Sequence, residues 1–126
     1  MPRLSPVEAI GRMGEIAMKN YQDKGWIGFD LDGTLAEYEP GQGISTIGKP
    51  IPKMVERLKR HIKQGYEVKI FTARGGNPQQ AEMVKEWLRT NKLPDLEVTD
   101  RKDYRMVKVY DDRAVVVEAN TGKILS

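Results

Sequence analysis

Short apolar runs alternate with amphipathic helical patterns in this chain, and this alternation limits the fold more than any other feature. Residues 26–29 and 68–71 form apolar runs that suit buried strands. Residues 52–62 and 81–88 then place apolar side chains at helical spacing, the second stretch after the capping sequence Asn77-Pro78-Gln79-Gln80. Strands that alternate with helices in this way predict an α/β fold, with a mostly parallel sheet between layers of helices in a three-layer Rossmann-like arrangement.

The remaining segments extend this pattern in both directions. A capping sequence at Ser5-Pro6-Val7-Glu8, followed by helical spacing, predicts an N-terminal helix within residues 1–24. Residues 36–50 contain prolines and glycines without a clear period, so they predict a loop or flap. Further strands are expected at Leu96–Thr99, Met106–Tyr110 and Ala114–Glu118, with a turn at residues 120–122 leading to a final short strand.

Composition predicts one globular domain over residues 1–126. Apolar residues make up 39% and charged residues 31%, with a net charge of +3, which is typical of a folded protein. The apolar runs are far too short to cross a bilayer and no signal-peptide pattern is present, so we expect a cytoplasmic protein without membrane partners. Because cysteine is absent, any bound metal should be a hard cation with oxygen or nitrogen ligands.

Acidic residues follow two of the predicted strands. Asp30 and Asp32 come directly after the first run and project to the same side, and Gly33 allows a sharp turn and the close approach of a ligand. Asp111 and Asp112 directly follow a later run, and the carboxyl ends of parallel strands meet at one edge of the sheet. Carboxylates gathered there would repel one another without a cation, which predicts a bound Mg²⁺ ion.

A phosphate group is the ligand that best matches such an edge, because Mg²⁺ offsets the repulsion between carboxylates and phosphoryl oxygens. Thr72 and Arg74 follow the second strand, and Lys102 precedes Asp111 on a short connection, so these three side chains are candidates to contact phosphoryl oxygens. Lys108 is a competing lysine, but it would lie inside a strand, on the order of 10 Å from the carboxyl end. Lys102 is therefore preferred.

The acidic and phosphate-contacting residues, in their order along the chain, resemble the four motifs of phosphatases of the haloacid dehalogenase (HAD) superfamily. The matching strings are Asp30-Leu31-Asp32-Gly33-Thr34-Leu35, Thr72, Lys102 and Asp111-Asp112. The resemblance covers about residues 26–118. It is strongest to small members of bacteria and phage and more distant to the phosphatase domain of polynucleotide kinases.

This resemblance implies a mechanism and a ligand set. Asp30 would attack phosphorus to form an aspartyl-phosphate, and Asp32 would protonate the leaving group and then activate water. The phosphoryl group would be held by Thr72, Lys102, Arg74 and Gly33. Mg²⁺ would bind the Asp30 carboxylate, the Asp32 backbone carbonyl and the acidic pair, with Asp111 as the preferred direct ligand and Asp112 acting through water.

The connections in this chain are too short to hold the cap domain found in many members of the family. Neither the flap after Thr34 nor the stretch between Thr72 and Lys102 has the required length, so an open site is expected. Such a site excludes water only if the substrate or a neighbouring subunit covers it. A macromolecular phosphate or a homo-oligomer is compatible with this expectation. Nucleotides, sugar phosphates, phosphorylated proteins and nucleic-acid ends all remain candidate substrates.

Two other functions are compatible with parts of the pattern. Receiver domains of two-component signalling share the length, the fold class and the residue types, but their acidic pair comes first and their phosphorylated aspartate stands alone on a later strand. A non-catalytic phosphate-binding protein is disfavoured because every motif position is retained. A calcium-binding EF-hand loop is excluded by its spacing. Such a loop has glycine at its sixth position, whereas Gly33 is at the fourth position of a loop that begins at Asp30.

Several basic residues have a second interpretation. The residues on the predicted helix at 52–62 and just beyond it are Lys53, Arg57, Lys59, Arg60, His61 and Lys63. A solvated polar face is the favoured interpretation of this run, contact with nucleic acid is the alternative, and His61 is expected to be neither ligand nor base. An ion pair with the adjacent carboxylates is the favoured role of Arg113, with phosphate contact as its alternative.

Overall fold

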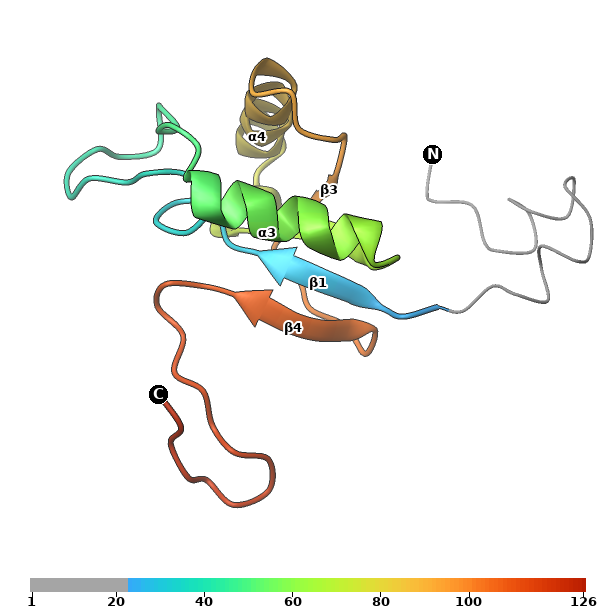
Figure 1. The fold of residues 1–126 in the computed structure, drawn as a ribbon. Helices are drawn as coiled ribbons and strands as arrows, with labels where there is room; N and C mark the ends of the chain where they lie inside the picture. The colour runs from blue at the N-terminus through green and yellow to red at the C-terminus, as the bar shows by residue number, and fades with distance from the viewer. Residues whose placement is uncertain (1–22) are drawn as a thin grey trace, which may run out of the picture.

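The computed structural model describes residues 23–126, which contain a four-stranded, all-parallel sheet and two α-helices (Figure 1). The strands are β1 (Trp26–Phe29), β2 (Glu67–Phe71), β3 (Glu97–Thr99) and β4 (Met106–Tyr110), in the order β3-β2-β1-β4. The helices are α3 (Pro52–Lys63) and α4 (Pro78–Thr90), and a 3₁₀ turn, η2, spans Ala73–Gly76. The predicted α/β Rossmann-like class is confirmed. None of the helices described is long and apolar enough to cross a membrane.

Both helices pack against the same face of the sheet. Ile27 and Phe29 of β1 lie in one buried cluster with Leu58 of α3 and with Val84 and Leu88 of α4. Alternate residues of a strand point to the same face, which explains why every second residue of β1 enters this cluster. A helical layer on the second face of the sheet is not found within residues 23–126.

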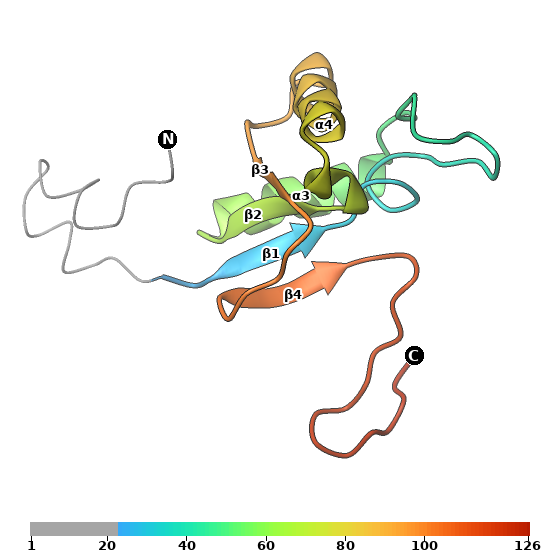
Figure 2. The same ribbon diagram turned by 180° about the vertical axis from the view of Figure 1, so that it is seen from behind.

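The second face is instead crossed by the connection between β3 and β4. In Figure 2 this connection passes in front of the sheet on its way to the start of β4. Trp26 is buried on this face, where its ring meets Phe71 edge-on and its Nε1–H donates to Asp103 Oδ1 at 2.8 Å. Lys69 places Nζ 4.6 Å from the centre of the same ring. The connection therefore supplies, without a helix, the polar partner that a buried indole needs.

Most element boundaries follow the local signals in the sequence. Both α3 and α4 have proline in the first turn, and Asn77 caps α4 by accepting hydrogen bonds from the N–H groups of Gln79 and Gln80. The bounds of β1 and β4 agree with the prediction, β2 begins one residue earlier and β3 one residue later. The flap at residues 36–50 contains no helix or strand, as expected. The predicted N-terminal helix falls outside the described residues, except for the last two positions of its range.

The strand predicted at residues 114–118 is wrong. An isolated antiparallel bridge joins Val117 to Ile124, and the expected final strand after the turn at residues 120–122 is reduced to this bridge. The segment forms an arm that leads away from the sheet in both views (Figures 1 and 2). Val115, Val116 and Val117 are 60%, 53% and 55% exposed. A run of β-branched residues favours extended backbone but does not specify a partner strand, which explains the error.

The interpretation of His61 as part of a solvated face is also wrong. The imidazole is buried, with Nδ1 3.1 Å from Gln64 Oε1 and Nε2 2.9 Å from the hydroxyl oxygen of Tyr110. His61 thus joins α3 to β4, and its ring lies 6.3 Å from that of Phe29, centre to centre. The sequence pattern failed because histidine is compatible with either side of an amphipathic helix when it finds partners for both nitrogens.

Truncating Leu58 tests the core between α3 and the sheet. Leu58→Ala should lower the free energy of unfolding by about 2–5 kcal/mol, because a fully buried leucine leaves a cavity that its neighbours fill only partly. Urea denaturation measures the change. The adjacent exposed substitution Lys59→Ala is the control and should change stability by less than about 0.5 kcal/mol. Equal effects would contradict this packing.

Candidate active site

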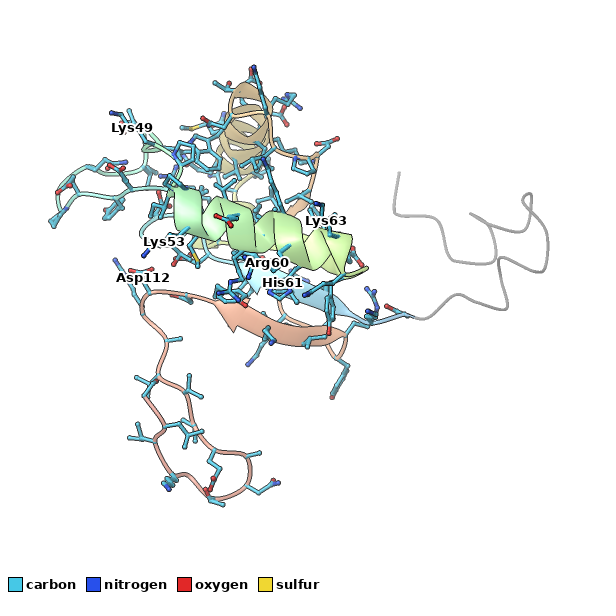
Figure 3. All side chains as sticks on the ribbon, viewed as in Figure 1. Lys49, Lys53, Arg60, His61, Lys63 and Asp112 are labelled. Carbon is cyan, nitrogen blue, oxygen red and sulfur yellow. The ribbon has the colours of Figure 1, made fainter. Side chains whose placement is uncertain are left out.

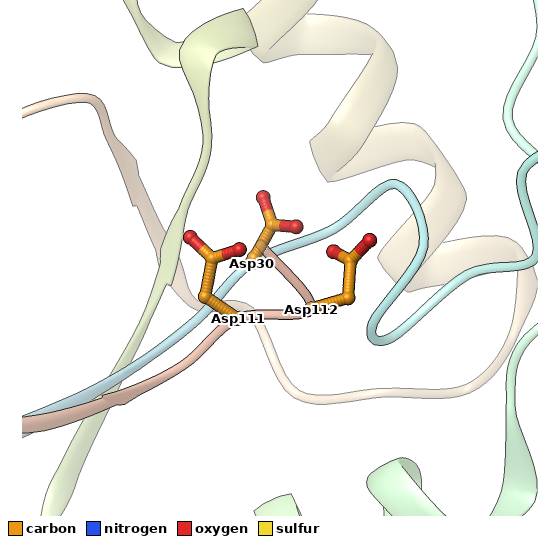
Figure 4. A group of neighbouring side chains, drawn as sticks. All are labelled: Asp30, Asp111 and Asp112. Atoms are coloured by element: carbon orange, nitrogen blue, oxygen red, sulfur yellow. The ribbon is translucent and has the colours of Figure 1, made fainter. Parts of the chain in front are cut away.

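The pairing of β1 with β4 brings three of the four predicted carboxylates together. Phe29 is in register with Tyr110, and the N–H of Asp30 donates to the Tyr110 carbonyl at 2.9 Å. Asp30 therefore lies beside Asp111 and Asp112, and Figure 4 shows the three side chains rising from the two strand ends. One carboxylate oxygen from each lies within 4.8 Å of the others. A single divalent cation could contact all three.

Thr34 holds this cluster in place, a role that the sequence analysis did not assign. Its Oγ1 lies 3.0 Å from Asp112 Oδ1 and 3.4 Å from Asp30 Oδ2, and it accepts a hydrogen bond from the Asp112 N–H at 3.0 Å. The tight turn after β1 brings it there, since the Leu31 carbonyl accepts the N–H groups of Thr34 and of the two residues after it. The signal in the sequence that could have indicated this role is the position of Thr34 within the first motif string, Asp30 to Leu35.

Gly33 is required by the packing of the same cluster. Its φ of +92° favours glycine, and an added Cβ would lie 2.7 Å from Asp112 Oδ2. The group that approaches Gly33 closely is the Asp112 carboxylate, whereas the prediction was for a ligand. The N–H of Gly33 donates to the Ala36 carbonyl at 2.8 Å, so a phosphate would have to displace this bond to use it.

Burial and neighbouring negative charge raise the pKa of Asp30 from 3.8 to about 7. Loss of solvent around the carboxyl group is the largest cause, followed by repulsion from Asp111 and by the hydrogen bond and charge of Asp112. A cation between these groups would favour the ionised form of Asp30 by offsetting both repulsions. Three hard oxygen donors at this spacing fit Mg²⁺.

Asp32 lies outside this cluster and is held by Arg74. The guanidinium donates from Nε to Asp32 Oδ2 at 2.7 Å and from Nη2 to Asp32 Oδ1 at 3.0 Å. Its other N–H groups donate to the carbonyls of Ile44 and Thr46 at 2.8 and 3.1 Å and to Gln80 Oε1 at 2.6 Å. All five N–H groups of Arg74 therefore have acceptors within the protein.

This arrangement changes the predicted role of Arg74. The side chain is 5% exposed and joins Asp32 to the flap and to α4. Contact with a substrate phosphate would require Arg74 to give up one of these bonds, which costs free energy in a buried site. The geometry favours Arg74 as a residue that positions Asp32.

A pocket of about 710 Å³ opens in front of these groups. Its lining includes the predicted site residues Asp30, Asp32, Thr72, Arg74 and Asp111. The other lining residues are Tyr38, Gly43, Ile44, Phe71, Ala73, Asn77, Gln80, Asp100 and Arg113. The size is that of a typical site for a small ligand or a single nucleotide.

The structure does not bring Lys102 to this pocket. Lys102 is exposed and absent from the lining, and its neighbour Asp103 bonds to Trp26 at the start of β1, the opposite end of the strand from Asp30. The connection from β3 to β4 turns back across the sheet directly after β3. Lys102, on this connection, therefore lies away from the edge of the sheet where the strands have their carboxyl ends. Lys108 is exposed in the middle of β4, opposite Ile27, and does not line the pocket either.

Two cationic residues, Arg74 and Arg113, line the pocket. Arg74 is paired with Asp32, whereas Arg113 has no ion-pair partner among residues 23–126. Its backbone N–H donates to Asp111 Oδ1 at 2.9 Å, but the ion pair expected for its guanidinium is not formed. This position favours the alternative interpretation of Arg113 from the sequence, which is contact with a phosphate.

Replacing Asp30 tests its raised pKa through protein stability. The folded state binds more protons than the unfolded chain between about pH 4 and 7, so stability falls as the pH rises through this window. Without divalent cations, Asp30→Asn should therefore be more stable than wild type at pH 8, on the order of 1–2 kcal/mol after allowing for solvent access. Thermal unfolding in chelator at pH 8 and pH 4 measures the difference, which should vanish at the lower pH. A constant difference would contradict the raised pKa.

A double-mutant cycle tests the pairing of Arg74 with Asp32. Arg74→Lys should cost about 1–3 kcal/mol of stability, because one ammonium cannot replace the five directed bonds of the guanidinium. Combined with Asp32→Asn, the coupling energy should reach at least about 0.5 kcal/mol. Arg89→Lys is the matched control, since Arg89 pairs with Glu82 and Glu86 on an exposed helix surface and should show little effect.

Comparisons with known proteins support the fold but do not indicate an activity. No family model and no curated protein matches this chain. Among solved structures, it is similar to a conserved protein from Bacteroides thetaiotaomicron, with a TM-score of 0.55 and 24% identity. The match covers 74% of this chain and 79% of the other. At this identity the likeness shows a shared fold.

Proposed function

We propose that this protein is a Mg²⁺-dependent phosphatase that hydrolyses phosphate monoesters through a phosphorylated Asp30. The observation that carries the proposal is the cluster of Asp30, Asp111 and Asp112 at the carboxyl ends of neighbouring parallel strands. The order of the motif residues, which resembles that of HAD phosphatases, supports the same conclusion. Receiver-like signalling or simple phosphate binding are the alternatives.

The metal would be held by the carboxylates of Asp30, Asp111 and Asp112. When bound there, Mg²⁺ would neutralise negative charge on the carboxylates and on the phosphoryl oxygens. Thr34 supports this set by fixing Asp112, and Gly33 leaves the room that the Asp112 carboxylate occupies. Such supporting contacts set the orientation of the ligands before the metal arrives.

The reaction would take place in two displacements. In the first, a carboxylate oxygen of Asp30 forms a bond to phosphorus, the ester P–O bond breaks, and the leaving oxygen takes a proton from Asp32. In the second, water attacks phosphorus and passes a proton to Asp32, while the bond between phosphorus and Asp30 breaks and inorganic phosphate leaves. Arg74 would set the position of Asp32 for both proton transfers.

Thr72 and Arg113 line the pocket and would contact the phosphoryl group. Thr72 Oγ1 accepts a hydrogen bond from the Arg74 N–H at 3.2 Å, which leaves its own hydroxyl proton available to a phosphoryl oxygen. In this proposal Arg113, which lines the pocket, would supply the positive charge that Lys102 was expected to provide. Cations and hydroxyl donors in these positions would stabilise charge on the equatorial oxygens.

Phosphate release from a panel of monoesters tests the function. Nucleotides, sugar phosphates and phosphorylated oligonucleotides should be compared with and without Mg²⁺. Asp30→Asn should lower the rate on the best substrate at least about a thousandfold, because it removes the nucleophile. Asp95→Asn, an exposed residue after α4, is the control and should keep full activity.

Two results would count against a phosphatase. Activity that persists in chelator or in Asp30→Asn would exclude the proposed chemistry. Silence across the panel, together with Mg²⁺ binding by calorimetry, would favour a phosphate-binding or receiver-like role for the same residues.

A further inference from the structure

Helix α3 carries an unbalanced positive charge. Its cationic residues are Lys53, Arg57, Lys59, Arg60 and Lys63, against a single acid, Glu56. By contrast, α4 balances Lys85 and Arg89 with Glu82 and Glu86. The positive charge of the described helices is thus concentrated on α3, as Figure 3 shows in part with Lys53, Arg60 and Lys63 along its length.

Three of these cations share one side of α3. Lys53, Arg57 and Arg60 follow the spacing i, i+4, i+7, which aligns side chains along a helix. Arg57 also lies four residues before His61, whose imidazole meets the hydroxyl of Tyr110 on β4. This row of cations therefore runs along the side of α3 that borders β4.

Lys108 adds a fourth cation to this border. It is in register with Ile27, which points into the core beneath α3, so Lys108 lies on the helical side of the sheet. It is exposed on β4, which is an edge strand of the described sheet. We call Lys53, Arg57, Arg60 and Lys108 the basic face.

The basic face has few acidic partners. Within residues 23–126, the one ion pair on the basic face joins Arg60 to Glu56 at 3.6 Å. Lys53, Arg57 and Lys108 form none there. Such a concentration of like charge costs free energy in the folded protein and attracts polyanions.

The basic face leads to the candidate active site. The start of α3 is joined to the loop after β1, because the N–H of Ile51 donates to the Leu35 carbonyl at 2.8 Å. The preceding residue, Thr34, bonds directly to Asp112. Lys53 in the first turn of α3 is therefore the cation of this face nearest the acidic cluster, in agreement with the positions labelled in Figure 3.

We propose that the basic face binds a single strand of nucleic acid whose terminal phosphate enters the acidic cluster. The proposal rests on the phosphatase function above and selects the nucleic-acid end from its candidate substrates. Lys53 and Arg60 are separated by about 10 Å along the helix axis, so the row of cations can contact more than one phosphate of a single strand. The terminal phosphate alone meets the carboxylates, where Mg²⁺ would offset their repulsion, while the internal phosphates meet cations.

The pocket fits the terminal nucleotide of such a strand. Its volume of about 710 Å³ accommodates one nucleotide, and Tyr38 and Ile44 on the flap offer an aromatic and an apolar surface beside the polar groups. Ile44 is 65% exposed. A base packed against these side chains would cover apolar surface that now faces water.

Binding of labelled single-stranded oligonucleotides, measured by fluorescence anisotropy, tests the proposal. The full chain with Asp30→Asn keeps a terminal phosphate intact during the measurement in Mg²⁺. Adding Lys53→Gln, Arg57→Gln and Arg60→Gln should weaken binding at least about tenfold at low salt. It should also make the dependence of log K on log salt shallower by about 2, as expected for three lost contacts with a single strand.

The matched control removes three cations from another surface. Lys85→Gln, Arg89→Gln and Lys92→Gln change the net charge equally and should leave affinity and salt slope close to those of the parent. A 3′- or 5′-phosphate should tighten binding over an unphosphorylated end, and the preferred end identifies the substrate. Equal losses in the two triple variants, no binding at low salt, or binding only to anionic lipid vesicles would overturn the proposal.

The two proposals fail in different ways. If phosphate release is absent but the triple variant on α3 binds less tightly than its control, the basic face is supported and the phosphatase is not. If small monoesters are hydrolysed but the two triple variants bind oligonucleotides equally, the phosphatase stands and the nucleic-acid proposal is overturned.

Discussion

The parallel pairing of β1 with β4 is the interaction on which the rest of the site depends. It places the carboxylate of Asp30 beside those of Asp111 and Asp112, although about 80 residues of chain separate Asp30 from this pair. Backbone hydrogen bonds between the strands fix this register, so the repulsion among three acids is imposed by the fold. Thr34 then ties the two strand ends together across the cluster.

A second network holds another part of the pocket lining. Arg74 is buried at the end of β2 and contacts Asp32, two flap carbonyls and Gln80 of α4. Groups from three segments, the turn after β1, the flap and α4, are thus fixed by one planar guanidinium, which a flexible ammonium could not replace. The site therefore has an acidic half and a half organised by arginine.

The sequence predicted what depends on local signals and missed what depends on long-range contacts. Proline and Asn77 marked the helix starts, and apolar runs ending at Asp30 and Asp111 marked two strands and the site. The positions of Lys102 and Arg113 relative to the pocket could not be predicted, because they depend on where the connection after β3 turns back across the sheet. The arm at residues 114–118 failed for the same reason, since extended backbone needs a partner that the pattern does not name.

The bonds between Arg74 and the flap have a consequence for how this site can diverge. Both acceptors on the flap are backbone carbonyls, those of Ile44 and Thr46, so these two bonds to Arg74 do not depend on the side chains at those positions. The side chains of Ile44 and Thr46 can therefore be exchanged while both bonds to Arg74 are kept. A substitution at Ile44 would change the lining of the pocket without removing an acceptor from Arg74.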